Sequence, residues 1–244
     1  MRNILVTGAS RGLGLAIARR LAADGYRVLG IARGNSDGLA AASAEARQHG
    51  SGAIEFAPFD LGRIEDIAAL VKDLRATHGP LFGLVNNAGL GTEGLLATMR
   101  QDDIERLVRL NTLAPITLAK HAVRSMMSGN GGRVVNMASI VADAGFSGLS
   151  VYAATKASMI GFTRSLAREV GPLGITVNAV APGFIATDMT AGLGEHGIER
   201  VARRAALKRL ATADEVAHAV AYLVGDGASG VTGTVLTVDA GGTA

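Results

Sequence analysis

The chain has 244 residues, a formal net charge of +3, no cysteine and no tryptophan. The absence of cysteine excludes disulfides, and the five histidines show no metal-ligand spacing, so the sequence indicates no metal site. The small net charge and the low aromatic content of 4% argue against a nucleic-acid partner. Hydrophobic residues make up 48% of the chain, but Gly, Arg or Asp interrupts each apolar run before the roughly 18 to 20 residues that span a bilayer, so we expect no membrane span. Parallel α/β folds of this length often form a single unit, and we expect one domain, 1–244. Because residues 1–8 lead directly into an apparent core strand and resemble no signal peptide, we expect a cytoplasmic protein.

Short β-branched runs alternate with longer stretches in which apolar residues recur every three or four positions, as in successive βαβ units. The predicted strands are 3–7, 27–31, 53–57, 82–86, 133–138, 176–180 and 234–238, and the predicted helices lie near 12–24, 37–49, 63–77, 101–127, 151–170 and 213–224. Several strands are apolar on consecutive residues, which is typical of strands covered on both faces. We therefore predict an α/β fold, a doubly wound parallel sheet of about seven strands with helices on both faces.

The turn after the first strand carries the first functional signal. Residues 7–14 are Thr-Gly-Ala-Ser-Arg-Gly-Leu-Gly and lead directly into a helix. Glycines let a backbone approach a ligand closely, and a helix N-terminus attracts phosphate. A tight turn without a ligand would use the same residues, but this position in a βαβ chain is where dinucleotides bind. The spacing Gly8-x-x-x-Gly12-x-Gly14 resembles the motif T-G-x-x-x-G-x-G of the short-chain dehydrogenase/reductase family, which implies a Rossmann-type fold over the whole chain.

The end of the second strand predicts the type of cofactor. NAD-selective folds place an acidic residue there to hold the ribose hydroxyls, and that acid would repel a 2′-phosphate. Here the strand ends at Ala32 and is followed by Arg33, while Arg11 lies in the glycine turn. Because two guanidinium groups can hold one phosphate, we predict NADP(H). Two solvated arginines are the alternative interpretation.

Three more segments, each after a strand, resemble family motifs. Asp60-Leu61 resembles the adenine-contacting pair, Asn86-Asn87-Ala88-Gly89 resembles N-N-A-G, and Pro182-Gly183-Phe184-Ile185-Ala186-Thr187 resembles P-G-x-I-x-T, whose Ile and Thr hold the nicotinamide carboxamide. The resemblance implies these cofactor-binding residues: Gly8, Ser10, Arg11, Gly12, Leu13, Gly14, Arg33, Asp60, Leu61, Asn87, Ala88, Gly89, Tyr152, Lys156, Pro182, Gly183, Ile185 and Thr187.

Tyr152 and Lys156 form the centre of the predicted catalytic group. Their four-residue separation at the start of a helix places both side chains on one face. A phenol with a pKa of about 10 is a poor base at neutral pH, and a nearby ammonium lowers that pKa. Tyr152 would protonate a carbonyl oxygen in reduction, or deprotonate an alcohol in oxidation. In the family, the lysine also holds the nicotinamide ribose, and Ser139, at the end of the fifth strand, matches the serine that holds the substrate oxygen.

Asn111, in the helix predicted near 101–127, matches the fourth catalytic residue of the family. Pro115 lies four residues later and has no N–H, so in a continuous helix the Asn111 carbonyl loses its usual partner. In the family, that carbonyl holds a water in a proton relay from the lysine to solvent. We predict that Pro115 helps keep the carbonyl available, with an ordinary proline kink as the alternative.

The resemblance implies an oxidoreductase that moves a hydride to or from a carbonyl carbon. Residues 165–170 and 181–190 are most similar to reductases of 3-oxoacyl groups held on acyl carrier protein. We therefore predict NADPH-dependent reduction of a 3-oxoacyl thioester of acyl carrier protein or coenzyme A. A dehydrogenase of another alcohol, sugar or cyclic ketone is the alternative. The intact catalytic group argues against a third candidate, a cofactor-binding protein without turnover.

The region that would meet a carrier protein gives a mixed signal. Where such reductases carry basic residues, this chain has Asn130 and Leu173. The predicted substrate loop, about 182–210, lacks a clear strand or helix rhythm. If 198–209 is helical, Arg200, Arg203, Arg204 and Lys208 share one face and could meet an acidic carrier or the phosphates of coenzyme A, although a solvated basic face explains them equally well.

Assembly is predicted from the resemblance. The family commonly forms tetramers through the two long helices on either side of the serine strand. The helix near 101–127 is apolar on more than one face, which is consistent with burial in a partner and also with an internal helix. We expect a homotetramer.

Overall fold

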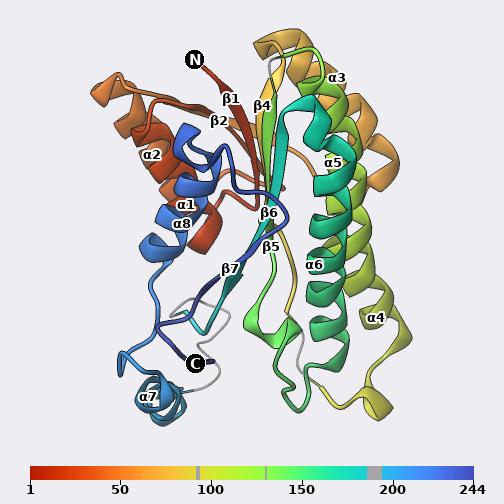
Figure 1. The fold of residues 1–244 in the computed structure, drawn as a ribbon, viewed down its shortest axis with the longest axis vertical. Helices are drawn as coiled ribbons and strands as arrows, with labels where there is room; N and C mark the ends of the chain where they lie inside the picture. Colours follow the sequence, from red (N-terminus) through yellow and green to blue (C-terminus); the bar gives the residue numbers. More distant parts are fainter. Residues whose placement is uncertain (92–93, 130, 186–193) are drawn as a thin grey trace.

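The computed structural model describes residues 1–91, 94–129, 131–185 and 194–244 of the chain. Seven parallel strands form one sheet in the order β3-β2-β1-β4-β5-β6-β7 (Figure 1). The strands are β1 Asn3–Thr7, β2 Arg27–Ala32, β3 Ala53–Pro58, β4 Leu81–Asn86, β5 Gly132–Met137, β6 Ile175–Pro182 and β7 Val235–Val238. Each predicted strand is confirmed to within two residues at either end. The doubly wound parallel sheet is therefore as the sequence predicts.

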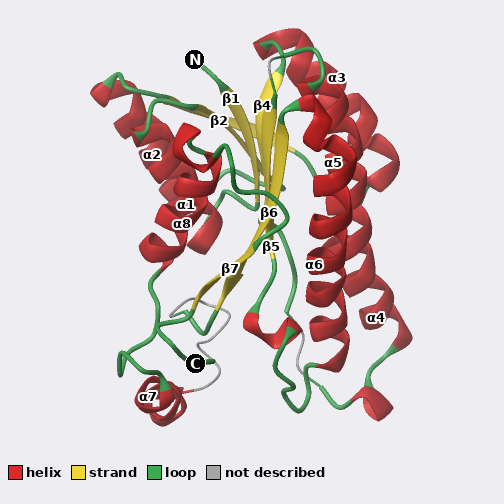
Figure 2. Ribbon diagram, in the orientation of Figure 1, coloured by secondary structure: helices red, strands yellow, loops and turns green. Residues whose placement is uncertain are grey.

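Helices cover both faces of this sheet (Figure 2). The helices are α1 Gly12–Ala23, α2 Asp37–His49, α3 Ile67–His78, α4 Gln101–Val108, α5 Ala114–Met126, α6 Ser150–Val170, α7 Gly194–Arg204 and α8 Ala213–Val224. One layer contains α1, α2 and α8, and the other contains α3, α4, α5 and α6. Each layer has its own apolar core, with Ile17 and Val220 in the first and Val71 and Leu118 in the second. Burial of these side chains on both faces makes the sheet a rigid frame.

The long helix predicted near 101–127 is interrupted, which corrects the sequence prediction. A π-helical segment, Arg109–Leu113, separates α4 from α5, and the N–H of Ala114 donates to the carbonyl of Arg109 five residues earlier. Pro115 explains the break, because its ring would collide with the carbonyl four residues before it and it has no N–H to donate. Asn111 lies in the middle of the wider turn.

The segment 182–210 also differs from its prediction as a loop, because α7 occupies Gly194–Arg204. The helix ends before Lys208, whose φ is +56° and whose Nζ donates to the carbonyl oxygen of Arg203 at 3.0 Å. The four basic residues therefore do not share one helical face. Arg203 is also paired with Glu199 at 3.3 Å.

The parallel arrangement brings several loops to one edge of the sheet. The carboxyl ends of β1, β4, β5 and β6 lie at the same edge, and the loops that follow them carry the residues singled out by the sequence (Figure 1). In open α/β sheets, ligands bind at this edge, beside the point where the strand order reverses. That point lies between β1 and β4. Within the described ranges, none of the helices is both long and apolar enough to cross a bilayer.

Candidate active site

Thr7 fixes the glycine turn to the loop after β4. Its hydroxyl accepts the backbone N–H of Asn87 at 2.9 Å and that of Ala88 at 2.8 Å, and the Asn87 side-chain amide donates to the Thr7 carbonyl oxygen at 2.8 Å. The Thr7 hydroxyl also lies 3.4 Å from the carbonyl oxygen of Val85, to which it can donate. The ends of the neighbouring strands β1 and β4 are thus held together by side chains as well as by the sheet.

Gly8 and Gly14 allow this close approach. A Cβ on Gly14 would lie 2.1 Å from the Gly8 carbonyl oxygen and 2.6 Å from the Asn87 amide nitrogen, so only glycine fits there. Gly8 has a φ of +69°, a conformation that L side chains rarely adopt. The start of α1 can therefore pack directly on the end of β1.

Gly12 leaves the N-terminus of α1 open. Its φ is +53°, and no atom lies within 4 Å of the position that a Cβ would take. The first turn of α1 contains no acidic residue, and the preceding residue, Arg11, caps no N–H with its side chain. The backbone N–H groups at this helix end point toward a space that suits an anion. Ser10 and Leu13 lie in the same turn, and Leu13 packs against the core below it.

A serine that the sequence analysis did not single out joins the glycine turn to the end of β2. The Ser36 hydroxyl donates to the carbonyl oxygen of Ser10 and accepts the N–H of Leu39, so it caps α2 at the same time. Arg33 lies between β2 and Ser36 and is exposed. The segment that carries Arg33 is therefore anchored beside the turn that carries Arg11.

Asp60 and Leu61 behave differently from each other. Asp60 is exposed at the end of β3, and its carboxylate accepts the N–H of Gly62 at 2.9 Å. The Leu61 side chain is buried in the apolar core with Leu29 and Ile67. An adenine contact from this pair would therefore involve Asp60 or the backbone of Leu61.

Lys156 is a buried cation. Its side chain is 6% exposed, its Nζ donates to the carbonyl oxygen of Met137 at 2.9 Å, and Nζ lies 5.7 Å from the centre of the Tyr152 ring. Burial lowers the pKa of Lys156 to about 8. The ammonium is still present at neutral pH, at a cost in desolvation.

Replacing Lys156 with Met is expected to raise stability at pH 7. Since the pKa of Lys156 is lower in the folded protein than its ordinary 10.5, folding opposes its charge, and the penalty of about 3 kcal/mol is fully present below pH 8. It disappears as the pH rises from about 8 to about 10.5, because the folded lysine then loses its proton first. After loss of the bond to Met137, we expect K156M to gain about 1–2 kcal/mol in urea unfolding at pH 7 and less at pH 9.5. K72M, at an exposed position of α3, is the control, and a K156M variant that is less stable at pH 7 would contradict the expectation.

Tyr152 lies at the start of α6, beside Ser139. Burial raises the pKa of Tyr152, while a hydrogen bond with the Ser139 hydroxyl lowers it. The sequence analysis expects Lys156 to lower this pKa. In the structure, the hydrogen bond with Ser139 lowers this pKa, and the Lys156 ammonium lies 5.7 Å from the centre of the Tyr152 ring. With its pKa raised, Tyr152 is a protonated phenol at neutral pH, as a proton donor must be.

Asn111 ties three elements together. Its side-chain oxygen accepts the N–H of Leu90 at 2.8 Å, and its amide donates to the Leu90 carbonyl at 2.8 Å and to the Thr155 hydroxyl at 3.1 Å. Thr155 in turn donates to the carbonyl of Tyr152 at 2.7 Å. The π-helical segment, the loop after β4 and α6 are thereby held in register.

Gly89 shows how close these groups are. A Cβ there would lie 3.2 Å from the Asn111 side-chain oxygen and 3.5 Å from Lys156 Nζ. Asn86, at the end of β4, donates to the side-chain oxygen of Asn136 at 2.9 Å and supports the sheet beneath. The structure thus brings Asn111, Ser139, Tyr152 and Lys156 to one place.

The loop after β6 closes the other side of the edge. Pro182 ends the strand, a Cβ on Gly183 would lie 2.5 Å from Asp239 Cβ, and Ile185 is buried and pairs with Ala211 in an isolated bridge. Thr187, predicted to bind the carboxamide, lies outside the described residues, as does Asn130.

Thr7, Ser36 and Thr155 are the residues that the sequence analysis missed as site residues. The hydroxyl of each forms a hydrogen bond with a nearby backbone or side-chain amide group. Their residue type alone does not predict this role, because serine and threonine are common in turns. Only the position of Thr7, at the start of the glycine motif, could have indicated its role.

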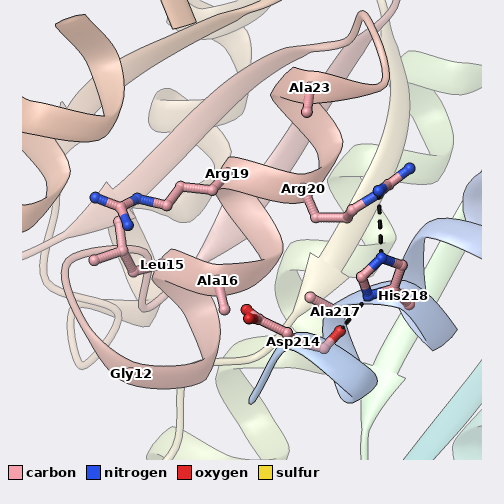
Figure 3. Close-up of a pocket in the computed structure, with 9 residues that line it drawn as sticks. All are labelled: Gly12, Leu15, Ala16, Arg19, Arg20, Ala23, Asp214, Ala217 and His218. Atoms are coloured by element: carbon pink, nitrogen blue, oxygen red, sulfur yellow. Dashed lines mark hydrogen bonds between the residues drawn. The ribbon is translucent and has the colours of Figure 1, made fainter. Parts of the chain in front are cut away.

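A groove between α1 and α8 lies apart from the catalytic group (Figure 3). Gly12, Arg20 and His218 are among the residues that line it. Arg20 and His218 contact each other at 3.3 Å, and His218 also contacts the backbone carbonyl of Asp214 at 2.7 Å. None of the four predicted catalytic residues lines it. The candidate catalytic site therefore lies at the sheet edge and not in this groove.

Comparison with known proteins points to one group of enzymes. A family model described as "Enoyl-(Acyl carrier protein) reductase" matches residues 8–243. The 3-oxoacyl-[acyl-carrier-protein] reductase FabG of Escherichia coli K12 is 40% identical over 237 residues, 97% of this chain and 95% of the relative. A short chain dehydrogenase from Burkholderia cenocepacia J2315 in complex with NADP has a TM-score of 0.92 at 39% identity, covering 100% and 98% of the two chains. A gluconate 5-dehydrogenase from the same strain, with NADP and tartrate, has a TM-score of 0.93 at 29% identity, covering 99% and 95%.

Proposed function

The chain belongs to the short-chain dehydrogenase/reductase family, and from this premise we propose that it reduces the 3-oxo group of an acyl thioester to a hydroxyl. It is an NADP-dependent oxidoreductase that acts on carbonyl and hydroxyl groups. The thioester substrate is proposed because a relative 40% identical over 97% of the chain is a 3-oxoacyl-[acyl-carrier-protein] reductase. The proposal covers thioesters of acyl carrier protein and of coenzyme A.

The residues at the sheet edge fit NADP. The open N-terminus of α1 and the glycine turn offer backbone N–H groups and space to the pyrophosphate. Ala32 leaves the end of β2 without an acid, and Arg33 and Arg11 are cations in the two segments that the Ser36–Ser10 hydrogen bond joins, so they would hold a 2′-phosphate. When bound, NADPH supplies the hydride that is added to the carbonyl carbon.

The chain's own residues would supply the proton and orient the substrate. The Ser139 hydroxyl and the Tyr152 phenol would both donate to the substrate oxygen, and Tyr152 would transfer its proton to that oxygen as the carbonyl becomes an alcohol. The ammonium of Lys156 would stabilise the phenolate that remains. Asn111 would hold the loop at Gly89–Leu90 in place and offer its backbone carbonyl to a proton-carrying water.

The observation that carries this proposal is the half-buried phenol beside Ser139 and the buried ammonium of Lys156, with Asn111 fixing the loop opposite. A cofactor-binding protein without turnover has no need for a phenol and a buried ammonium held together at a cost in stability. A reductase does, because it must protonate an oxygen in a place from which water is excluded.

The first test is steady-state oxidation of NADPH, with NADH in parallel, on acetoacetyl-coenzyme A and a longer 3-oxoacyl thioester. We expect turnover that prefers NADPH. Turnover only with an alcohol, a sugar acid or a cyclic ketone would reject the thioester and leave the oxidoreductase chemistry in place.

Replacing Arg33 with Ala is expected to weaken NADPH binding about 10- to 100-fold and to leave NADH binding within about twofold. The reason is that a charge-assisted hydrogen bond to the 2′-phosphate, worth about 1.5–3 kcal/mol, exists only with NADPH. Titration of cofactor fluorescence measures both affinities. Arg47→Ala, at an exposed arginine near the end of α2, is the control. An equal loss for both cofactors would mean that Arg33 supports the fold instead.

Assembly and location remain predictions. Val108 and Leu113, on the predicted tetramer helices, are 38% and 47% exposed in the single chain, which supports a partner on that face. Light scattering should give about four times the chain mass of 24.8 kDa. We also propose a cytoplasmic location.

A further inference from the structure

Two phenylalanines face each other across the loops beside the catalytic group. Phe146 lies in the loop between β5 and α6, and Phe184 follows Gly183 after β6, so they come from loops after neighbouring strands. Their rings meet edge to face, with centres 5.8 Å apart and planes at 73°. Phe146 is 37% exposed and Phe184 is half-buried. Along the chain, Phe146 lies between Ser139 and Tyr152, and Phe184 lies in the loop predicted to hold the nicotinamide.

The loop after β4 carries two exposed leucines and is attached to the loop that carries Phe146. Leu95 and Leu96 are 63% and 58% exposed. The N–H of Gly94 donates to the carbonyl of Gly148 at 2.9 Å, which attaches this loop to the one that carries Phe146. We call Leu95, Leu96, Phe146 and Phe184 the apolar mouth. Figure 1 shows that the three loops extend from the same end of the sheet as the start of α6.

The apolar mouth does not serve the core. None of its four side chains belongs to the core clusters of the described residues or to the half-buried side chains that pack on them. Exposed apolar groups gathered at one place are typical of a binding surface. Because Phe146 is exposed and Phe184 is half-buried outside these clusters, the aromatic pair is available to a ligand.

We infer that Phe146 and Phe184 form a wall for the hydrocarbon tail of the substrate and so select for acyl chain length. The inference rests on the proposed function, because the 3-oxo carbon must reach Tyr152 and Ser139. From that carbon the thioester leaves in one direction and the alkyl tail in the other. A tail of several carbons gains by covering the aromatic rings, whereas a sugar acid, which is polar along its length, gains nothing there.

The experiment compares chain lengths in the wild type and in variants of the wall. The kcat/KM of NADPH oxidation is measured with 3-oxobutanoyl, 3-oxohexanoyl and 3-oxooctanoyl thioesters of N-acetylcysteamine. In parallel, calorimetry measures binding of the non-reducible butanoyl and octanoyl thioesters in the presence of NADP. The variants are F146A, F146L and F184A. The control is L173A, which removes a side chain that is 43% exposed at the far end of α6.

For the wild type and L173A we expect both kcat/KM and affinity to rise at least about tenfold from the shortest to the longest chain, since each fully buried methylene contributes about fourfold and four methylenes are added. F146A and F184A should flatten this rise to about twofold or less with little change for the four-carbon substrate, and F146L should keep most of it. A wild type without chain-length dependence in calorimetry, or an equal loss at every length in F146A, would overturn the inference. Chain-length-dependent binding without turnover would sustain the wall and reject the proposed reaction.

Discussion

Replacing Tyr152 with Phe is expected to lower kcat/KM for carbonyl reduction by about a thousandfold or more while NADPH affinity stays within about twofold. The substitution removes one oxygen and leaves the ring and its contacts in place. General acid catalysis is worth about 100- to 10,000-fold, and Tyr152 is the protonated group beside Ser139. Single-turnover NADPH oxidation separates the chemical step from binding. In the parent enzyme, reduction should slow as the pH rises, because the phenol must carry its proton.

The control for this variant is Tyr222→Phe on α8, where the ring is 53% exposed and distant from the site in sequence and in layer. It should behave as the wild type does. If Tyr152→Phe keeps more than about a tenth of the activity, another group delivers the proton, and Ser139 would be the next candidate.

Replacing Gly14 with Ala is expected to cost about 2–4 kcal/mol in stability and at least about tenfold in NADPH affinity. The new methyl group would lie 2.1 Å from the Gly8 carbonyl oxygen, and backbone cannot move aside as a flexible side chain can. The start of α1 would shift away from β1, and the N–H groups that face the pyrophosphate would shift with it.

Thermal unfolding and cofactor titration measure the two effects. Gly161→Ala is a matched control, because Gly161 lies within α6 and a Cβ there meets no atom within 4 Å. Alanine favours a helix over glycine by about 1 kcal/mol, so this variant should be as stable as the wild type or more so. Equal stability of the two variants would show that the first turn of α1 can adapt.

Much of this fold was predictable because local pattern and tertiary role agree. The consecutive apolar residues of β1 and β5 are buried on both faces, so a simple hydrophobic run identifies them. The interrupted helix shows where this fails. Pro115 indicates a break, but whether the chain kinks or forms a π-helical turn depends on how α4 and α5 pack, and that information is not local.

The site was predictable in its residues and less so in its contacts. Tyr152 and Lys156 follow from their spacing together with Ser139, the glycine turn and the family resemblance. The partner of the ammonium, however, is the backbone carbonyl of Met137, which has no side-chain signature. The Thr7 contacts were hidden for the same reason, since its partners are backbone N–H groups of a distant strand end. Contacts of this kind depend on which strands become neighbours.

The attachments of the loop after β4 bear on how this protein can vary. Loops usually accept insertions and deletions more readily than the elements they connect. This one is held at Asn87 and Ala88 by Thr7, and two residues later at Leu90 by Asn111. Adding or removing one residue would break one of the two attachments, whereas exchanging a side chain need not. We therefore expect homologous chains to differ here in the identity of residues and not in their number.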